Sequence, residues 1–188
     1  MKPLTIYLIL FVLAFPAYSQ TRRSASVPSF LNHVYYYTPD SLTDLEQNTA
    51  RMESKTKAMG YGGSEGGFYM DGAKSIVRIR AGDSIRFIVK MNMSMMDPSM
   101  MLKLYKFDSR KGNREAIVSS QGGMFSGGKS KNNASEIIFN IQKSGTDDYI
   151  LVPASRLAPG EYAFLNLMMV NGAGSRSSSY TGFAFGVD

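Results

Sequence analysis

Apolar residues at every second position between Ile85 and Met95 limit most strongly how this chain folds. The row consists of Ile85, Phe87, Val89, Met91, Met93 and Met95, and the positions between them include Arg86, Lys90, Asn92 and Ser94. Successive side chains of a strand point to opposite faces, so this spacing predicts a β-strand with one buried face. The methionines thereby extend a hydrophobic row.

Similar short segments recur along the chain, separated by turns rich in Gly, Ser, Pro and Asp. We expect strands at 32–38, 75–80, 84–95, 100–104, 114–119, 135–142, 149–152, 161–170 and 181–187. We expect the second and third of these to form a hairpin around the turn at 80–83, and Met100, Leu102 and Leu104 to form the inner row of the fourth. Segment 42–58 fits a helix or a long polar strand, and we favour the strand because its neighbours are strands. The pattern predicts an all-β fold of about 8–9 strands, a sandwich or a barrel.

The first 19 residues have the layout of a secretory signal peptide. Lys2 precedes an apolar run from Leu4 to Phe15, and Ala17-Tyr18-Ser19 offers small residues for cleavage before Gln20. A retained membrane anchor is the alternative, but the run is shorter than the ~20 apolar residues that a span requires. We expect a leader at 1–19, a flexible lead-in at 20–30, one domain at 31–188 and no stable span after cleavage.

The composition restricts the chemistry open to an exported chain. The chain contains no cysteine, which excludes thiol catalysis, cysteine zinc sites and disulfides. The net charge of +6 becomes +5 when Lys2 leaves with the leader. A modest basic excess favours acidic partners such as lipid headgroups or anionic polysaccharide. We expect no nucleic-acid partner, because an exported protein rarely meets one.

One motif narrows the fold. Leu157-Ala158-Pro159-Gly160-Glu161-Tyr162 resembles the L-x-P-G-x-Y tyrosine corner of immunoglobulin-like and fibronectin-type sandwiches. The resemblance implies a single immunoglobulin-like antiparallel β-sandwich, with Leu157, Pro159, Gly160 and Tyr162 in structural roles. An ordinary Pro-Gly turn before a strand is the alternative. The motif and the ending FGVD also resemble uncharacterised exported proteins of Gram-negative bacteria, which implies nothing about activity.

The methionines raise the question of a soft-metal site. Thioethers bind Cu(I) and survive in oxidising compartments, so Met95, Met96, Met100 and Met101 are candidate ligands of a periplasmic copper protein. Methionine is also an adaptable core residue. Because Met91, Met93 and Met95 continue the buried row, we favour packing and expect no cofactor.

The sequence contains a formal match to a phosphate-binding loop. Residues 123–130, GMFSGGKS, satisfy G-x-x-x-x-G-K-[ST]. The following Lys131-Asn132-Asn133 begins a helix poorly, and the alternating strand–helix pattern of nucleotide-binding folds is missing. We interpret this segment as a glycine-rich hairpin loop.

Catalytic machinery is not evident in the sequence, so we expect a protein that is not an enzyme. The single histidine, His33, lies beside an aromatic strand with no recognisable nucleophile elbow. A pair of carboxylates from different strands could still act on a glycan, but no spacing selects such a pair.

The candidate partner-binding residues are aromatic or basic. They are Tyr35, Tyr36, Arg78, Arg80, Arg86 and Lys90. Exposed tyrosines stack on sugars or anchor protein contacts, and the four cations would form one patch if their strands were adjacent. Charges that protect sheet edges are the alternative interpretation.

We therefore expect a non-catalytic exported domain in the periplasm, at the cell surface or outside the cell. It would bind or support a protein or glycan of the envelope. Cu(I) binding through Met91–Met101 is the second hypothesis, and a small glycan-active enzyme is the third.

Overall fold

The computed structural model of the chain describes residues 27–56, 63–82, 84–92, 97–122, 130–132, 135–171 and 178–188. The strands are β1 (Val34–Thr38), β2 (Ser41–Asp44), β3 (Glu46–Thr56), β4 (Gly63–Asp71), β5 (Arg78–Ile79), β6 (Phe87–Lys90), β7 (Leu102–Arg110), β8 (Asn113–Gly122), β9 (Ser130–Asn132), β10 (Glu136–Ile137), β11 (Phe139–Lys143), β12 (Asp148–Pro153), β13 (Gly160–Asn171) and β14 (Ser179–Val187), and the single helix among the described residues is α1 (Pro98–Met101). The fold is all-β, as the alternation predicts. Within the described residues, no helix is long and apolar enough to cross a membrane.

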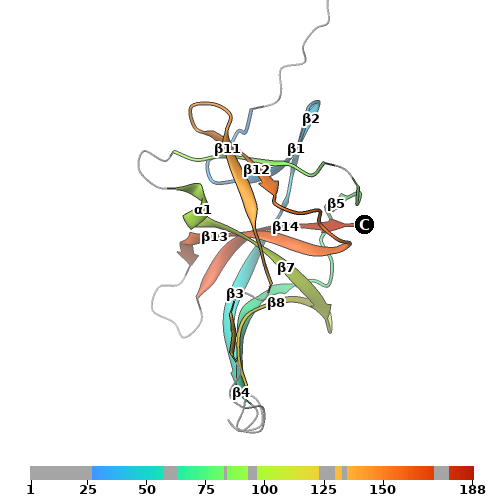
Figure 1. The fold of residues 1–188 in the computed structure, drawn as a ribbon, viewed down its shortest axis with the longest axis vertical. Helices are drawn as coiled ribbons and strands as arrows, with labels where there is room; N and C mark the ends of the chain where they lie inside the picture. Colours follow the sequence, from blue (N-terminus) through green and yellow to red (C-terminus); the bar gives the residue numbers. More distant parts are fainter. Residues whose placement is uncertain are drawn as a thin grey trace, which may run out of the picture.

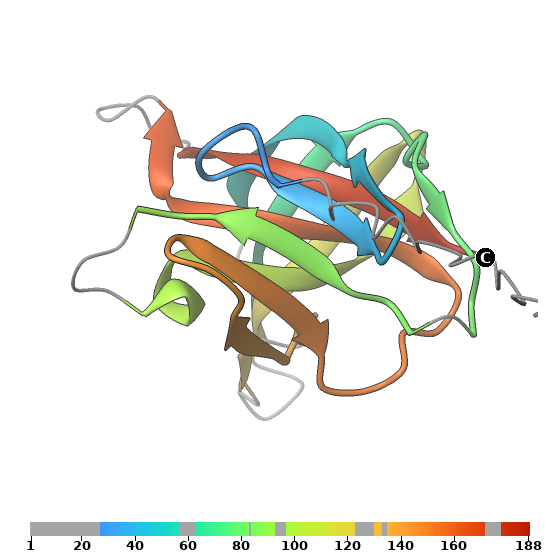
Figure 2. The same ribbon diagram turned by 90° about the horizontal axis from the view of Figure 1, so that it is seen from above.

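The strands form two sheets. The smaller sheet has the order β11-β12-β6-β1-β2, and the larger has the order β10-β7-β13-β14-β3-β4-β8-β9, with β5 beside β14. Figure 1 shows β1, β2, β11 and β12 at one end of the molecule, while β3, β4 and β8 extend to the other end. Seen from above in Figure 2, the strands of the smaller sheet lie in front of β13 and β14 as a separate layer.

The larger sheet closes into a barrel. Asp108–Arg110 of β7 pair with Asn113–Glu115 of β8. Strands β7, β13, β14, β3, β4 and β8 therefore form a complete circuit. The two layers of a sandwich are present, but one layer is a barrel, and the expectation of a simple immunoglobulin-like sandwich is corrected to that extent.

Aromatic rings fill the space between the two sheets. Phe87 of the smaller sheet lies 4.9 Å from Phe164 and 4.7 Å from Phe185 of the larger sheet, measured between ring centroids. The predicted row of β6 lies here, since Ile85, Phe87, Val89 and Met91 are all buried. The period-two prediction is confirmed as far as Met91, and Met93 and Met95 lie outside the described residues.

The barrel interior forms a second core, lined by the opposite faces of the same strands. Ala163 and Ala184 point inward, toward a group that includes Phe68 and Phe107. A Cβ at Gly182 would lie 3.0 Å from Leu165. Small residues therefore alternate with aromatic residues on β13 and β14, because a barrel of six strands has little room inside.

The β7–β8 hairpin divides into a fork that Ser135 occupies. Below the three paired positions, β7 pairs with β10 and β8 pairs with β9. The amide of Lys106 donates to the Ser135 carbonyl at 2.8 Å, and the Ser135 hydroxyl donates to the Ile117 carbonyl at 3.0 Å. Ser135 thus bonds both arms of the hairpin at the point where they separate.

Three local expectations are corrected. First, β5 and β6 do not form a hairpin, because β5 pairs in parallel with β14 whereas β6 pairs with β1 and β12. Second, segment 135–142 is not one strand. It changes sheet at Ile138, whose side chain is exposed.

Third, Met100 does not belong to an inner strand row. It lies in α1 with 66% of its surface exposed, whereas Leu102 and Leu104 are fully buried. The Asp97 carboxylate caps this helix by accepting from the Ser99 amide at 2.8 Å. The favoured strand interpretation of 42–58 is confirmed by β2 and β3 for residues up to Thr56.

Candidate binding site

The β7–β8 hairpin presents two cations at its turn. Lys111 and Gly112 form the two-residue turn between Arg110 and Asn113, which face each other in the ladder. Lys111 has φ 49° and Gly112 has φ 84°. Positive φ at both central positions is the geometry of a type I′ hairpin, which favours Asn or Gly over lysine at the first position. The lysine is therefore held in a left-handed conformation that costs conformational energy.

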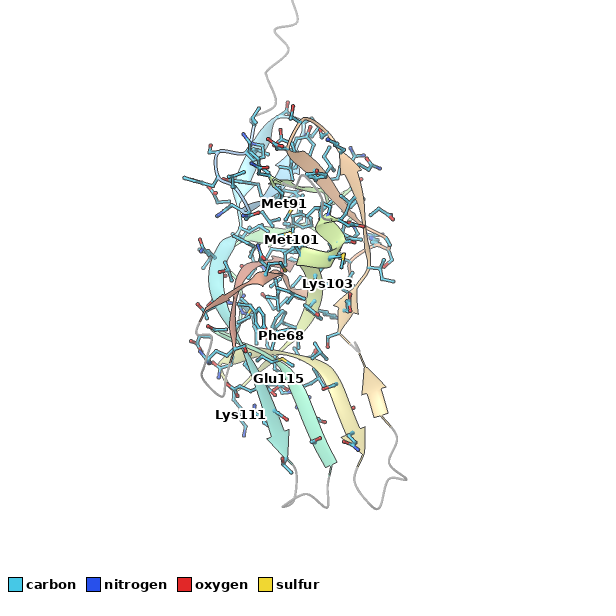
Figure 3. All side chains as sticks on the ribbon, turned by 90° about the vertical axis from the view of Figure 1, so that its left-hand side faces the viewer. Phe68, Met91, Met101, Lys103, Lys111 and Glu115 are labelled. Carbon is cyan, nitrogen blue, oxygen red and sulfur yellow. The ribbon has the colours of Figure 1, made fainter. Side chains whose placement is uncertain are left out.

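A concavity lies between this turn and strands β3 and β4. It has a volume of about 500 Å³ and is lined by Lys55, Tyr69, Arg110, Lys111, Asn113 and Glu115. These side chains contribute three positive charges and one negative charge, a net charge of +2. Figure 3 places Lys111 and Glu115 with Phe68, on the part of the barrel remote from Met91 and Met101.

The floor of the concavity is the outer surface of the barrel wall. Tyr69 faces Arg51 across β3 and Glu115 across β8 in the ladder registers. Opposite residues in antiparallel strands point to the same face. Phe68, one position earlier, points to the barrel interior instead, so the alternation of β4 places the Tyr69 ring on the outside.

Ion pairs engage several charges of this face. Arg51 donates to both carboxylate oxygens of Asp71, at 3.1 and 2.9 Å. This hydrogen bonding, together with the charge of Arg51, holds the pKa of Asp71 below its usual value. Arg110 lies 2.9 Å from Glu115. The ammonium of Lys55 lies 3.7 Å from the centre of the Tyr69 ring, a cation–π contact.

The predicted methionine ligands do not form one described cluster. Met91 is fully buried in the core, Met101 is half-buried against it, and Met100 is exposed. Met95 and Met96 lie outside the described residues. Among the residues the structure describes, no group of three histidine, aspartate or glutamate side chains is arranged to hold a metal ion.

The two predicted tyrosines lie on opposite faces of β1. Tyr35 is buried, with its hydroxyl oxygen accepting from the Phe30 amide at 3.3 Å. Tyr36 is half-buried and its ring lies 6.1 Å from that of Phe87. Both rings therefore contribute to packing in this structure.

The four predicted basic residues are distributed over two sheets. Arg78 of β5 donates to Glu161 at 2.5 Å and also pairs with Asp188, and Arg80 follows it with an exposed side chain. Arg86 and Lys90 lie in or beside β6 of the smaller sheet. The structure does not bring these four cations together.

The tyrosine corner has the geometry its motif implies. The Tyr162 hydroxyl donates to the Ala158 carbonyl at 2.7 Å, and both Leu157 and Tyr162 are buried. Gly160, after Pro159, has φ 155°, within the range that favours glycine. These residues fix the entry into β13.

Other sequence predictions fall outside the described residues or have structural surroundings. The leader at 1–19 and residues 123–129 of the glycine-rich loop are not described. His33 lies 3.2 Å from Asp44, and its ring packs 4.8 Å from that of Phe183.

Sequence reasoning missed the concavity because its lining comes from three separate segments. The signal that was available is Lys111-Gly112, a turn pair between two strands. Comparison of the chain with family models, with curated proteins and with solved structures finds no match. The geometry of the chain itself is therefore the basis for its functional interpretation.

Proposed function

We propose that this chain is a non-catalytic binding domain that acts outside the cytoplasm and binds an acidic polymer of the cell envelope or its surroundings. The concavity with Lys55, Arg110 and Lys111 around Tyr69 carries the proposal. Cations, an amide and an aromatic ring bind an anion and orient it. The leader-like N-terminus supports an exported location, in the periplasm, at the cell surface or outside the cell.

The strain at Lys111 supports the same interpretation. A non-glycine residue at positive φ is uncommon, and such residues cluster at functional sites. Glycine or asparagine at this position would form the turn with less strain. A lysine retained there places a cation at the rim of the concavity, where an approaching anion meets it first.

For the fold, we infer that the two-layer part is related to immunoglobulin-like sandwiches, with closure of the barrel as an elaboration. The Tyr162–Ala158 hydrogen bond supports this relation. The expected outcome is that the tyrosine corner and both sheets occur together in the experimental structure of a homologue, and a homologue with only one of them would contradict the relation.

The binding proposal is tested with the chain from Gln20 to Asp188. Binding to an anionic polysaccharide is measured by calorimetry at 50 and 300 mM salt, with a neutral dextran as comparison. We expect affinity for the anionic polymer alone, falling as salt rises. Lys111→Glu should lower the affinity roughly tenfold or more, because it reverses a charge at the rim.

A matched control is Lys143→Glu, which reverses an exposed charge on β11 in the smaller sheet. It should leave the affinity unchanged. Equal loss from both variants would mean that the net charge, not this concavity, governs binding. Absence of binding to any anionic polymer would contradict the proposal. N-terminal sequencing of the exported protein should begin at Gln20.

A further inference from the structure

Lys55 covers the Tyr69 ring. Its ammonium lies 3.7 Å above the ring centre, and only 6% of the Tyr69 surface is exposed. Lys55 itself lies near the end of β3 and is exposed. The concavity thus has an aromatic floor. The outer face of this ring is covered by Lys55, whose four-carbon side chain is flexible.

The contact between Lys55 and Tyr69 is easily exchanged. A cation–π contact at a surface is weaker than a hydrogen bond between an ammonium and an acidic oxygen. A ligand with an acidic group beside an apolar ring surface can therefore replace this contact for both Lys55 and Tyr69. The acidic group binds the ammonium, and the ring surface packs on the tyrosine.

The neighbouring groups fit such a ligand. Asn113 supplies an amide that donates and accepts hydrogen bonds, and Arg110 and Lys111 supply further cations. The Arg110–Glu115 pair places an acceptor 2.9 Å from the guanidinium, so the wall offers acceptors as well as donors. Hydroxyl-bearing rings with acidic substituents can use all of these groups, whereas poly-glutamate and polyphosphate have no ring surface to place on Tyr69.

We infer that the ligand of this concavity is an acidic polysaccharide, bearing carboxylate or sulfate groups, and that Lys55 is a displaceable cover on Tyr69. The inference rests on the proposed function and specifies its ligand. Binding moves the ammonium from the ring to the acidic group, and a sugar ring then stacks where the ammonium lay.

The chain provides a direct probe of this stacking because it contains no tryptophan. Tyr69→Trp introduces the single tryptophan of the protein at the floor of the concavity. A carboxylated polysaccharide should change the tryptophan emission, and the dissociation constant from this signal should agree with calorimetry. A sulfated polysaccharide is the parallel arm, and the tighter of the two identifies the acidic group.

Poly-glutamate and polyphosphate are the non-sugar probes. At equal ionic strength we expect acidic polysaccharide to bind roughly tenfold more tightly than either one, as stacking on an aromatic ring warrants. Tyr69→Leu should remove this preference, whereas Tyr69→Phe keeps the ring and should retain it. Thermal melting of each variant verifies that it is folded.

Lys55→Ala removes the side chain that covers Tyr69 without altering the barrel core, and so distinguishes the role of the lysine from that of the ring. It should weaken binding of acidic polysaccharide and strengthen binding of a neutral oligosaccharide, because the ring is uncovered. Equal affinities for poly-glutamate and polysaccharide, with no effect of Tyr69→Leu and no tryptophan signal, would overturn the inference and leave an anion-binding domain. Loss of all anion binding would remove the proposed function as well.

Discussion

Arg114 donates from Nη2 to Oε1 of Glu46 at 2.9 Å, joining the start of β8 to the start of β3 at one end of the barrel. Only 1% of Arg114 is exposed, and it also donates to the carbonyls of Asp71 and Gly72. Burial raises the pKa of Glu46, but hydrogen bonds from Ser75, Arg114 and the Ile76 amide outweigh it and hold the pKa below its usual value. The ionised pair therefore links β8 to β3 at this end of the barrel.

Arg114→Met is expected to destabilise the protein by about 3–5 kcal/mol, because it leaves the Glu46 carboxylate without its buried partner. Chemical denaturation followed by circular dichroism measures the change. Arg110→Met is the control, since Arg110 is exposed and its pair with Glu115 should contribute about 1 kcal/mol or less. Similar losses in the two variants would mean that burial of the Arg114–Glu46 pair has no special weight.

Met91→Ala is expected to cost about 2–5 kcal/mol, because a fully buried methionine leaves a cavity when truncated. Met100→Ala should change the free energy of unfolding by less than about 0.5 kcal/mol, since the side chain is exposed on α1. Thermal melts of both variants test the division between core and surface methionines. A neutral Met91→Ala would contradict the two-sheet core described above.

Lys111→Gly is expected to stabilise the protein by about 1 kcal/mol while weakening its binding of acidic polysaccharide. Glycine adopts positive φ without the steric cost that lysine bears. Denaturation and calorimetry on the same preparation measure the two effects. A variant that is more stable and binds equally well would show that Lys111 takes no part in recognition.

The stability of the protein should fall in alkaline solution as the pH rises from about 10. Burial raises the pKa of Tyr105 to about 12, with smaller contributions from Glu136 and Tyr180. The folded state then retains a proton that the unfolded state, with a pKa near 10, has lost. Stability from this difference is fully present below pH 10 and is lost as the pH rises toward 12.

Tyr105→Phe should reduce this alkaline loss, which for one group is at most roughly 2–3 kcal/mol. Denaturation at pH 9, 10, 11 and 12 measures it in both proteins. Tyr162, whose pKa is also raised by burial, should retain its own part of the effect. An unchanged pH dependence in Tyr105→Phe would exclude Tyr105 as its source.

Strands with one largely apolar face were easier to predict from the sequence than strands that are buried on both faces. In segment 85–91 one face is apolar throughout, whereas the other carries Arg86 and Lys90 beside Ile88, so the orientation of the strand was predictable from period two. In β13 and β14 both faces are buried, and alternation alone does not distinguish the second core. The small residues Ala163, Gly182 and Ala184 between aromatic rings were the available indication of a narrow barrel.

The pairing of strands that are distant in the sequence was harder to predict. Nothing local states that β5 joins β14, or that Lys55 and Lys111 share one concavity, because strand order is set by contacts across the whole fold. The helix that contains Met100 could have been predicted, since Asp97-Pro98-Ser99 is a helix-start signal and is stronger evidence than the apparent alternation of the following residues. The tyrosine corner was predictable because its hydrogen bond is local.

The fork at Ser135 has a consequence for alternative folds of this chain. A hairpin with a two-residue turn forms locally and early, and β7 and β8 are both long enough to continue pairing beyond their three shared positions. Ser135 satisfies the Lys106 and Ile117 groups that an extended hairpin would use. The extended hairpin is a competing structure, and the native chain excludes it with Ser135 at the fork and with the pairing of β10 to β7 and of β9 to β8.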